Sequence, residues 1–207
     1  MKKRSILAIA IVMTMVFSSC NSDDDNTVVT EPVESQQVSN LYAPQTGGQG
    51  QPTGGAFTKF DFETGMQTTS ETDWDIAFRG TSIAVNGGTA TGTADEPERN
   101  GNAGVSIATG TFDSVTSAEG FDFKQDSEGS YAISTGSDGW YAYNQTTHII
   151  SAIPGKVLVF RTHNGNYAKV EILSYYKDAP ANPTLESESR YYTFNYVYNP
   201  NEGATNF

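Results

Sequence analysis

The chain has 207 residues, of which 12 are Lys or Arg and 24 are Asp or Glu, and its formal charge is −12. This length predicts one domain or at most two, and the acidic balance argues against a nucleic-acid partner because phosphate backbones repel it. An aromatic content of 12% indicates a packed core. The single cysteine excludes an intramolecular disulfide, a four-cysteine zinc site and a CxxC redox motif.

The N-terminus has the pattern of an export signal. Three basic residues, Lys2 to Arg4, precede an apolar stretch, Ser5 to Phe17, that is too short to span a bilayer. The run Phe17-Ser18-Ser19-Cys20 resembles a bacterial lipobox. We expect residues 1–19 to be a lipoprotein signal peptide and Cys20 to receive the lipid. An ordinary signal peptide followed by an incidental cysteine is the alternative.

Residues 20–55 are predicted to form a flexible acidic tether. They are rich in Asp, Thr, Ser, Gln, Gly and Pro, and apolar residues are sparse. The acidic run Asn21 to Asp25 resembles the surface-export signal of Bacteroidetes lipoproteins, and a solvated linker is the alternative. Part of the tether, Val38 to Pro44, is expected to add a short edge strand to the following domain.

Residues 56–207 are predicted to form an all-β domain, mostly antiparallel, with few short helical turns. Alternation along residues 57–62 predicts a half-buried strand, and alternation of Trp74, Ile76 and Phe78 with polar or small residues predicts a second strand. The pair Asn164-Gly165 predicts a hairpin with a type I′ turn. A short helix or turn is expected near Ser114 to Glu119. Strands are expected at residues 57–62, 74–79, 81–85, 140–143, 149–153, 156–162, 167–176 and 190–198, and residues 101–107 form either a strand or a bulged loop.

The motifs of the common catalytic classes are missing from the sequence. GxSxG, HExxH, a phosphate-binding loop and an EF-hand loop do not occur, and the chain has only two histidines. We therefore predict that the protein is not an enzyme.

Several segments of the predicted domain together resemble the HmuY family of Bacteroidetes lipoproteins. The resemblance covers roughly residues 37–199 and is carried by Asp73 to Phe78, Asn86-Gly87-Gly88, Gly101 with Gly104, Gly139-Trp140, Lys156 to Thr162, Asn164 to Val170, Ser174 to Tyr176, and Tyr192 to Tyr196. It implies an antiparallel β protein with a haem-binding cleft at one end. It also implies a haemophore-like role: haem taken from carrier proteins and passed to an outer-membrane receptor, by a protein that is lipid-anchored at the cell surface or released extracellularly.

The family's iron ligands do not transfer directly to this sequence. In the best-known member two histidines hold the iron, one before and one after the Trp140 strand. Residues 112–138 contain neither His nor Met, and the second position aligns with Gln145, three residues before His148. His148 is the main candidate iron ligand, with an exposed loop histidine of no role as the alternative. Met66 is a weaker candidate ligand.

Other side chains are assigned supporting or structural roles. Tyr141, Tyr143 and Gln145 are candidate ligand-binding residues, the two tyrosines either as phenolate ligands or by stacking on a porphyrin, with ordinary packing as the alternative. Trp74 and Trp140 are expected to anchor the core. His163 is expected to be a turn residue without a role in binding.

Two main functions remain open, with adhesion or a structural surface role as a third alternative. The first is a surface lipoprotein that binds haem for iron acquisition. The second is a lipoprotein of the same fold that has lost iron ligation and binds another hydrophobic ligand or a protein partner, which the missing first histidine favours.

Overall fold

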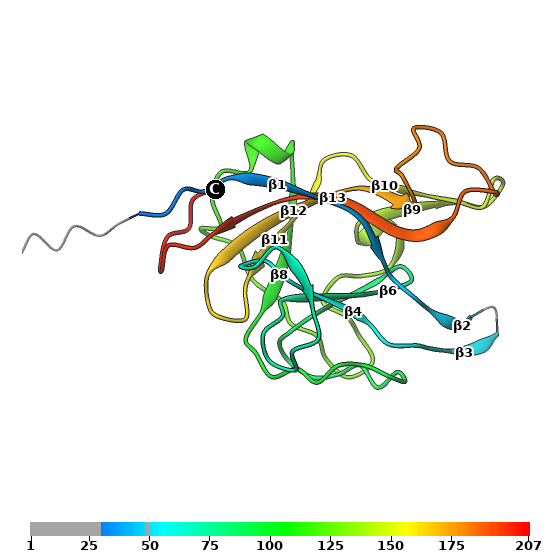
Figure 1. The fold of residues 1–207 in the computed structure, drawn as a ribbon, viewed down its shortest axis with the longest axis horizontal. Helices are drawn as coiled ribbons and strands as arrows, with labels where there is room; N and C mark the ends of the chain where they lie inside the picture. Colours follow the sequence, from blue (N-terminus) through cyan, green and yellow to red (C-terminus); the bar gives the residue numbers. More distant parts are fainter. Residues whose placement is uncertain (1–29, 49) are drawn as a thin grey trace, which may run out of the picture.

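The computed structural model describes residues 30–48 and 50–207, and antiparallel strands dominate this part of the chain (Figure 1). The predicted signal peptide, Cys20 and the acidic run lie outside the described residues. Among the residues described, none forms a helix with the length and apolar character needed to cross a membrane. The prediction of an all-β, mostly antiparallel fold is confirmed.

The larger sheet has five strands in the order β1-β13-β12-β11-β8. Its strands are β1 (Ser35–Tyr42), β8 (Gly104–Thr109), β11 (Lys156–Arg161), β12 (Tyr167–Tyr176) and β13 (Ser189–Asn199). All neighbouring pairs are antiparallel. Strand β1 is an edge strand that begins inside the segment predicted to be the tether, so the β domain takes in more of the chain than the composition suggested.

The smaller sheet has four strands in the order β5-β4-β6-β7. Its strands are β4 (Thr58–Asp61), β5 (Met66–Thr68), β6 (Ile76–Arg79) and β7 (Ser82–Val85). Two further hairpins stand apart from these sheets, β2 (Thr46–Gly48) with β3 (Gln51–Gly54) and β9 (Tyr141–Asn144) with β10 (Ile149–Ala152). Two short 3-10 turns complete the structure, η1 (Phe112–Ser114) and η2 (Gly136–Asp138).

An aromatic core joins the two sheets. Alternate residues of β13 point inward, as predicted, and Phe194 packs edge-on against Phe60 of β4 with ring centroids 5.5 Å apart. Phe78 of β6 lies 4.7 Å from the ring of Tyr192. Burial of such large apolar surfaces is the main stabilising contribution, because it removes about 150–250 Å² per aromatic side chain from water.

Strand β6 is covered on both faces. All four of its residues are buried. Ala77 belongs to a second apolar layer with Phe57, Trp74 and Ala84 on the outer face of the small sheet. Loops between β7 and β9 cover this layer, and a buried cluster fixes them: Arg99 pairs with both Asp126 and Glu96 at 2.9 Å.

The turn between β11 and β12 differs from the predicted type I′ turn. A type I′ turn needs positive φ at both central residues, but only Gly165 has it, at 92°, and Asn164 does not. The Gly165 N–H donates to the Thr162 carbonyl, and the Thr162 N–H donates to the backbone carbonyl of Asn166. The connection is therefore a three-residue loop with glycine in the left-handed position.

The predicted short helix at Ser114 to Glu119 is also displaced. This segment instead has the 3-10 turn η1, which starts earlier, at Phe112, and the Thr111 side chain accepts a hydrogen bond from the Ser114 backbone N–H. The buried Lys169 ammonium donates hydrogen bonds to the carbonyl oxygens of Phe112 and Val115, at 2.8 and 2.9 Å. These contacts hold the segment in its irregular path across the outer face of the large sheet.

Candidate functional site

The β9–β10 hairpin carries most of the residues that the sequence singled out. It lies at the end of the molecule opposite residue 30 and the C-terminus (Figure 1). Asn144 pairs with Ile149, which leaves a four-residue loop, Gln145 to His148. The Asn144 side-chain oxygen accepts from the N–H groups of Thr146 and Thr147 at 2.9 and 3.0 Å and so shapes the loop.

His148 occupies the last loop position in a left-handed conformation, with φ of 57°. This conformation costs roughly 1–2 kcal/mol for a residue with a side chain. The ring is exposed, and its Nδ1 lies 2.5 Å from the hydroxyl of Tyr143. The Tyr143 contact leaves the second ring nitrogen, Nε2, as the atom of His148 that is able to bind a metal.

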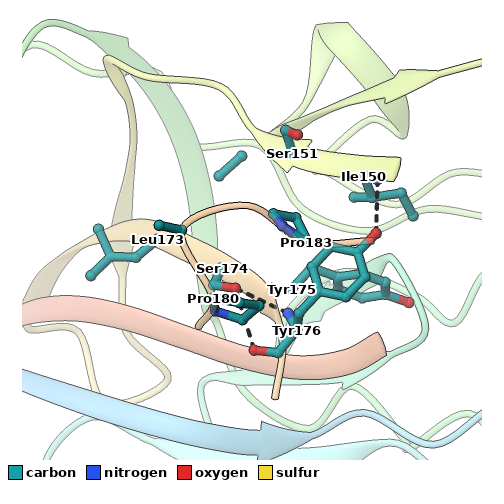
Figure 2. A pocket seen from close by; sticks show the side chains of 10 residues that line it. Ile150, Ser151, Leu173, Ser174, Tyr175, Tyr176, Pro180 and Pro183 are labelled. Carbon is teal, nitrogen blue, oxygen red and sulfur yellow. Dashed lines mark hydrogen bonds between the residues drawn. The ribbon is translucent and has the colours of Figure 1, made fainter. Parts of the chain in front are cut away.

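A small pocket lies between the hairpin and the loop that joins β12 to β13 (Figure 2). Its volume is about 170 Å³, and it is lined by Ile150, Ser151, Ala152, Leu173, Ser174, Tyr175, Tyr176, Pro180, Ala181 and Pro183. The Ile150 N–H donates to the Tyr176 hydroxyl at 3.0 Å, which fastens the hairpin to β12. Tyr143 lies opposite Ile150 in the hairpin, so the two side chains share one face.

Three large apolar side chains of β9, β12 and the β12–β13 loop are partly exposed. Tyr143 is 49% exposed, Leu173 is 43% exposed and Leu185, in the β12–β13 loop, is 73% exposed. Exposed apolar side chains that gather in one region are typical of ligand or partner sites, whereas single scattered ones are normal. These three side chains therefore mark the hairpin end of the molecule as a candidate ligand surface.

A buried aromatic cluster supports the base of the hairpin. Trp140 is 2% exposed, as predicted for a core anchor, and its ring lies 4.8 Å from Tyr141 and 5.9 Å from Tyr175. Burial raises the pKa of Tyr175 to about 12 in spite of the nearby Arg190, so this phenol stays protonated at neutral pH. Tyr175 is accordingly a packing residue and is unsuited to binding iron as a phenolate.

The remaining predicted site residues are placed separately. Gln145 is exposed at the start of the hairpin loop. Tyr141 is half-buried, and its hydroxyl lies 3.5 Å from the Thr81 hydroxyl. Met66 is 62% exposed, but it begins β5 in the small sheet and does not line the pocket beside His148.

The size of the pocket limits the ligand that it can enclose. Pockets that enclose drug-sized ligands span about 300–1,000 Å³, so the pocket of about 170 Å³ cannot enclose a porphyrin. The exposed His148 is not among the residues that line this pocket. Among the described residues, no second histidine or methionine adjoins this pocket.

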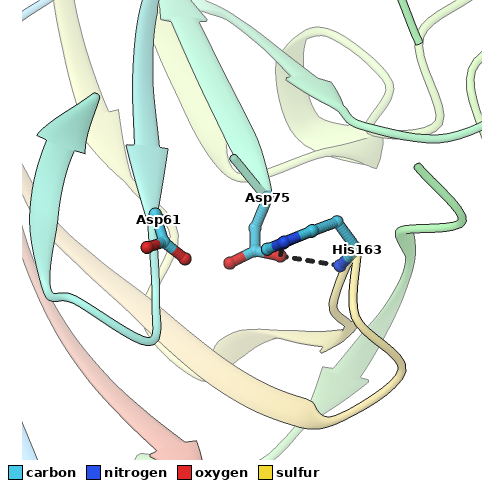
Figure 3. A group of neighbouring side chains, drawn as sticks. All are labelled: Asp61, Asp75 and His163. Carbon is cyan, nitrogen blue, oxygen red and sulfur yellow. Dashed lines mark hydrogen bonds and ion pairs between the residues drawn. The ribbon is translucent and has the colours of Figure 1, made fainter. Parts of the chain in front are cut away.

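The second histidine belongs to a different cluster, which the sequence reasoning missed (Figure 3). The buried carboxylate of Asp75 accepts from the backbone N–H and the ring Nδ1 of His163, at 2.7 and 2.9 Å, and from the Phe62 N–H at 2.8 Å. Side-chain oxygens of Asp61 and Asp75 and a ring nitrogen of His163 lie within 4.8 Å of one another. The hydrogen bond to Asp75 raises the pKa of His163.

His163 is therefore more than a turn residue, and that prediction was incomplete. It ties the β11–β12 hairpin of the large sheet to Asp75, which immediately precedes β6 of the small sheet. The signal in the sequence was Asp75 itself, a carboxylate inside an apolar run, since a buried charge needs a partner. Two arginines of the strands donate to backbone carbonyls: Arg79 to those of Gly55 and Ala94, and Arg161 to that of Asn102.

Comparison with solved structures finds similar chains at low identity. An apo HmuY analogue from Tannerella forsythia has 14% identity and a TM-score of 0.44, and the match covers 83% of this chain and 98% of that one. A Bacteroides vulgatus protein described as HmuY-like and haem-binding has 15% identity and a TM-score of 0.46, with coverage of 81% and 92%. A Bacteroides fragilis protein described as a lipoprotein has 15% identity and a TM-score of 0.48, with coverage of 80% and 88%.

Comparison with curated proteins gives no significant match. The family comparison is more informative, because the profile of the HmuY protein family matches residues 55–196. This match takes in both sheets' central strands, the β9–β10 hairpin and the His163 turn, and it covers more than half of the chain. The chain belongs to the HmuY family.

Proposed function

We propose that this protein binds haem at the β9–β10 hairpin, with the Nε2 atom of His148 as the protein ligand of the iron. The observation that carries the proposal is the exposed His148 ring, held through Nδ1 by Tyr143 at 2.5 Å beside exposed apolar side chains. Membership of the HmuY family supports a role in binding rather than in catalysis.

Bound haem would supply an iron with an axial position for the imidazole and a flat apolar ring that needs to be shielded from water. Tyr143 and Leu173 offer partly exposed apolar surface to such a ring. Tyr143 also fixes the orientation of the imidazole through Nδ1. The left-handed backbone at His148 is consistent with a functional position, because local strain is often retained where a side chain must be presented.

The proposed cellular role is haem acquisition at the cell surface. In this proposal residues 1–19 are removed, Cys20 carries the lipid, and the residues between Cys20 and β1 form the tether to the outer membrane. Residues 30–34, which lead into β1, lie at the end of the domain opposite the β9–β10 hairpin (Figure 1). The hairpin would then face away from the membrane, where it could receive haem from carrier proteins before delivery to an outer-membrane receptor.

The second candidate function is binding of a hydrophobic ligand without iron ligation. It is favoured by the pocket of about 170 Å³, which is too small to enclose a porphyrin, and by the absence of a second histidine or methionine beside it in the described residues.

Parallel titrations with haemin and with iron-free protoporphyrin IX separate the two functions. Ligation by His148 predicts at least about tenfold tighter binding of haemin, since an iron–imidazole bond worth 1.4 kcal/mol or more is available only to haemin. Haemin should also give a sharp Soret band. Equal affinities with a broad Soret band would contradict iron ligation and support the second function.

A further inference from the structure

The cluster of Asp61, Asp75 and His163 brings metal-binding side chains of both sheets together, outside the β9–β10 hairpin (Figure 3). Asp61 ends β4, Asp75 immediately precedes β6, and His163 lies in the β11–β12 turn. The two carboxylates belong to residues that are only 5% and 1% exposed. The His163 side chain is 17% exposed, so the imidazole is the member of the cluster that solvent reaches.

The negative charge of this cluster exceeds the positive charge that the protein places beside it. Asp75 forms an ion pair with His163 at 2.9 Å, and no described Lys or Arg pairs with Asp61 or Asp75. Asp61 accepts hydrogen bonds only from the uncharged donors of Glu63 and Thr64. One imidazolium offsets at most one of the two buried carboxylates. Because buried charges are normally paired or bind a metal, the cluster favours a further cation.

We infer that the juxtaposed side chains of Asp61, Asp75 and His163 form a binding site for a divalent metal ion of the zinc class. This inference is independent of haem binding. Zinc binds imidazole nitrogen and carboxylate oxygen at about 2.0–2.2 Å. Asp75 Oδ1 and His163 Nδ1 are 2.9 Å apart, which is close enough for both to bind one ion.

Asp61 completes the set of three ligands. Oxygen and nitrogen atoms of the three side chains lie within 4.8 Å of one another. Atoms bound to one tetrahedral zinc ion are about 3.4 Å apart, so a rotation that moves the Asp61 carboxylate by roughly 1 Å is sufficient. The metal takes the place of the Nδ1 proton of His163, which is released to solvent on binding. Water would fill the fourth position, as in other zinc sites with three protein ligands.

The ligand types favour zinc over calcium and magnesium. Calcium takes six to eight oxygen ligands, and magnesium prefers an octahedron of oxygens. Imidazole nitrogen suits zinc and its neighbours among the transition metals. A set of two carboxylates and one imidazole is therefore better matched to Zn²⁺.

A bound ion would join the two sheets. Asp61 and Asp75 belong to the segments of the small sheet, whereas His163 belongs to the turn between two strands of the large sheet. An ion that binds the folded protein and not the unfolded chain stabilises the folded state. Zn²⁺ should therefore raise the melting temperature of the wild-type protein.

Four variants of the full chain isolate the site. Asp61→Asn removes a carboxylate but keeps a side-chain oxygen for the backbone N–H groups of Glu63 and Thr64. His163→Gln removes the imidazole but keeps a hydrogen-bonding side chain. The controls are Asp73→Asn, which removes an exposed carboxylate near the cluster, and His148→Gly, which removes the other of the two histidines.

Isothermal titration calorimetry with ZnCl₂ measures binding, with CaCl₂ and MgCl₂ titrated in parallel. We expect one Zn²⁺ per chain in wild type, bound more tightly than Ca²⁺ or Mg²⁺. Loss of an outer hydrogen-bond partner alone typically weakens metal binding by about 10–100-fold, so loss of a ligand in Asp61→Asn or His163→Gln should weaken it by at least about 10-fold. The two controls should match wild type in affinity and in the rise of melting temperature with Zn²⁺.

Three results would overturn the inference. The first is Zn²⁺ affinity in Asp61→Asn and His163→Gln equal to that of wild type. The second is loss of binding in His148→Gly, which would place the ion at the exposed histidine of the hairpin. The third is binding of Zn²⁺ by wild type that is no tighter than that of Ca²⁺ or Mg²⁺.

Discussion

Asp75 and His163 show how one buried carboxylate can organise residues from three parts of the chain. Asp75 is 1% exposed and accepts hydrogen bonds from the backbone of Phe62 and from both the backbone and the ring of His163. Burial of a charged carboxylate without partners would be strongly destabilising. The three hydrogen bonds therefore make the position of the β11–β12 turn dependent on this residue pair.

The pair predicts a pH dependence of stability. The hydrogen bond to Asp75, together with the charges of Asp75, Asp61 and Asp73, raises the pKa of His163 above its ordinary value of 6.5 and outweighs the opposing effect of burial. A raised pKa in the folded state means that the stabilisation is complete below pH 6.5 and is lost as pH rises through the folded-state value.

Denaturant unfolding as a function of pH measures this effect. We expect the free energy of unfolding of wild type to fall as pH rises above 6.5. The variant His163→Gln keeps a hydrogen-bonding side chain but cannot titrate, so its curve should be flatter in that range. Parallel curves for the two proteins would contradict the assigned ion pair.

Residue-level reasoning from the sequence singled out His148 as a candidate ligand, which stays a prediction, and missed the role of His163. His148 was found because it lies in a polar loop beside an aromatic strand, which is a local pattern. The partner of His163 is Asp75, 88 positions away in the chain. A contact at that separation depends on how the two sheets pack, and local patterns contain no information about it.

At the scale of elements, the β11–β12 hairpin depends on one glycine. Gly165 has φ of 92°, and an added Cβ would meet no atom within 4 Å. Substitution there is therefore a test of backbone strain alone. Gly165→Val should lower the free energy of unfolding by about 1–3 kcal/mol, as measured by denaturant unfolding.

Gly165→Asn is the matched control, because asparagine tolerates left-handed conformations better than valine does. We expect it to lose less stability than Gly165→Val. If both variants were as stable as wild type, the positive φ at this turn would be contradicted.

Elements with strong local patterns were predicted well, and elements shaped by distant contacts were not. The strands around the Asn164-Gly165 turn and the alternating aromatic strand β13 were predicted because a period of two residues defines a strand. The type of turn was not, because the hydrogen bonds from His163 to Asp75 lie outside the turn's own sequence. The displaced 3-10 turn at Phe112 likewise depends on Lys169, a residue of β12.

At the scale of the molecule, two packed sheets form a frame and two smaller hairpins project from it (Figure 1). The frame accounts for most of the buried aromatic residues. The loop of the β9–β10 hairpin, Gln145 to His148, does not pack into the core and is exposed. This division separates residues that maintain the fold from residues that are available to a ligand.

The central claim is that His148 is the protein ligand of haem iron. The variant His148→Gly tests it cleanly, because glycine adopts the positive φ of this position without strain and should leave the melting temperature close to that of wild type. His163→Ala is the comparison, since it removes the other histidine, which lies in the β11–β12 turn and not in the β9–β10 hairpin.

The decisive measurement is the Soret absorption spectrum during haemin titration of these three proteins. The account predicts a shifted Soret band and binding weakened by about 10-fold or more in His148→Gly, with the wild-type spectrum retained in His163→Ala. An unchanged spectrum and affinity in His148→Gly, or loss of binding in His163→Ala alone, would contradict it.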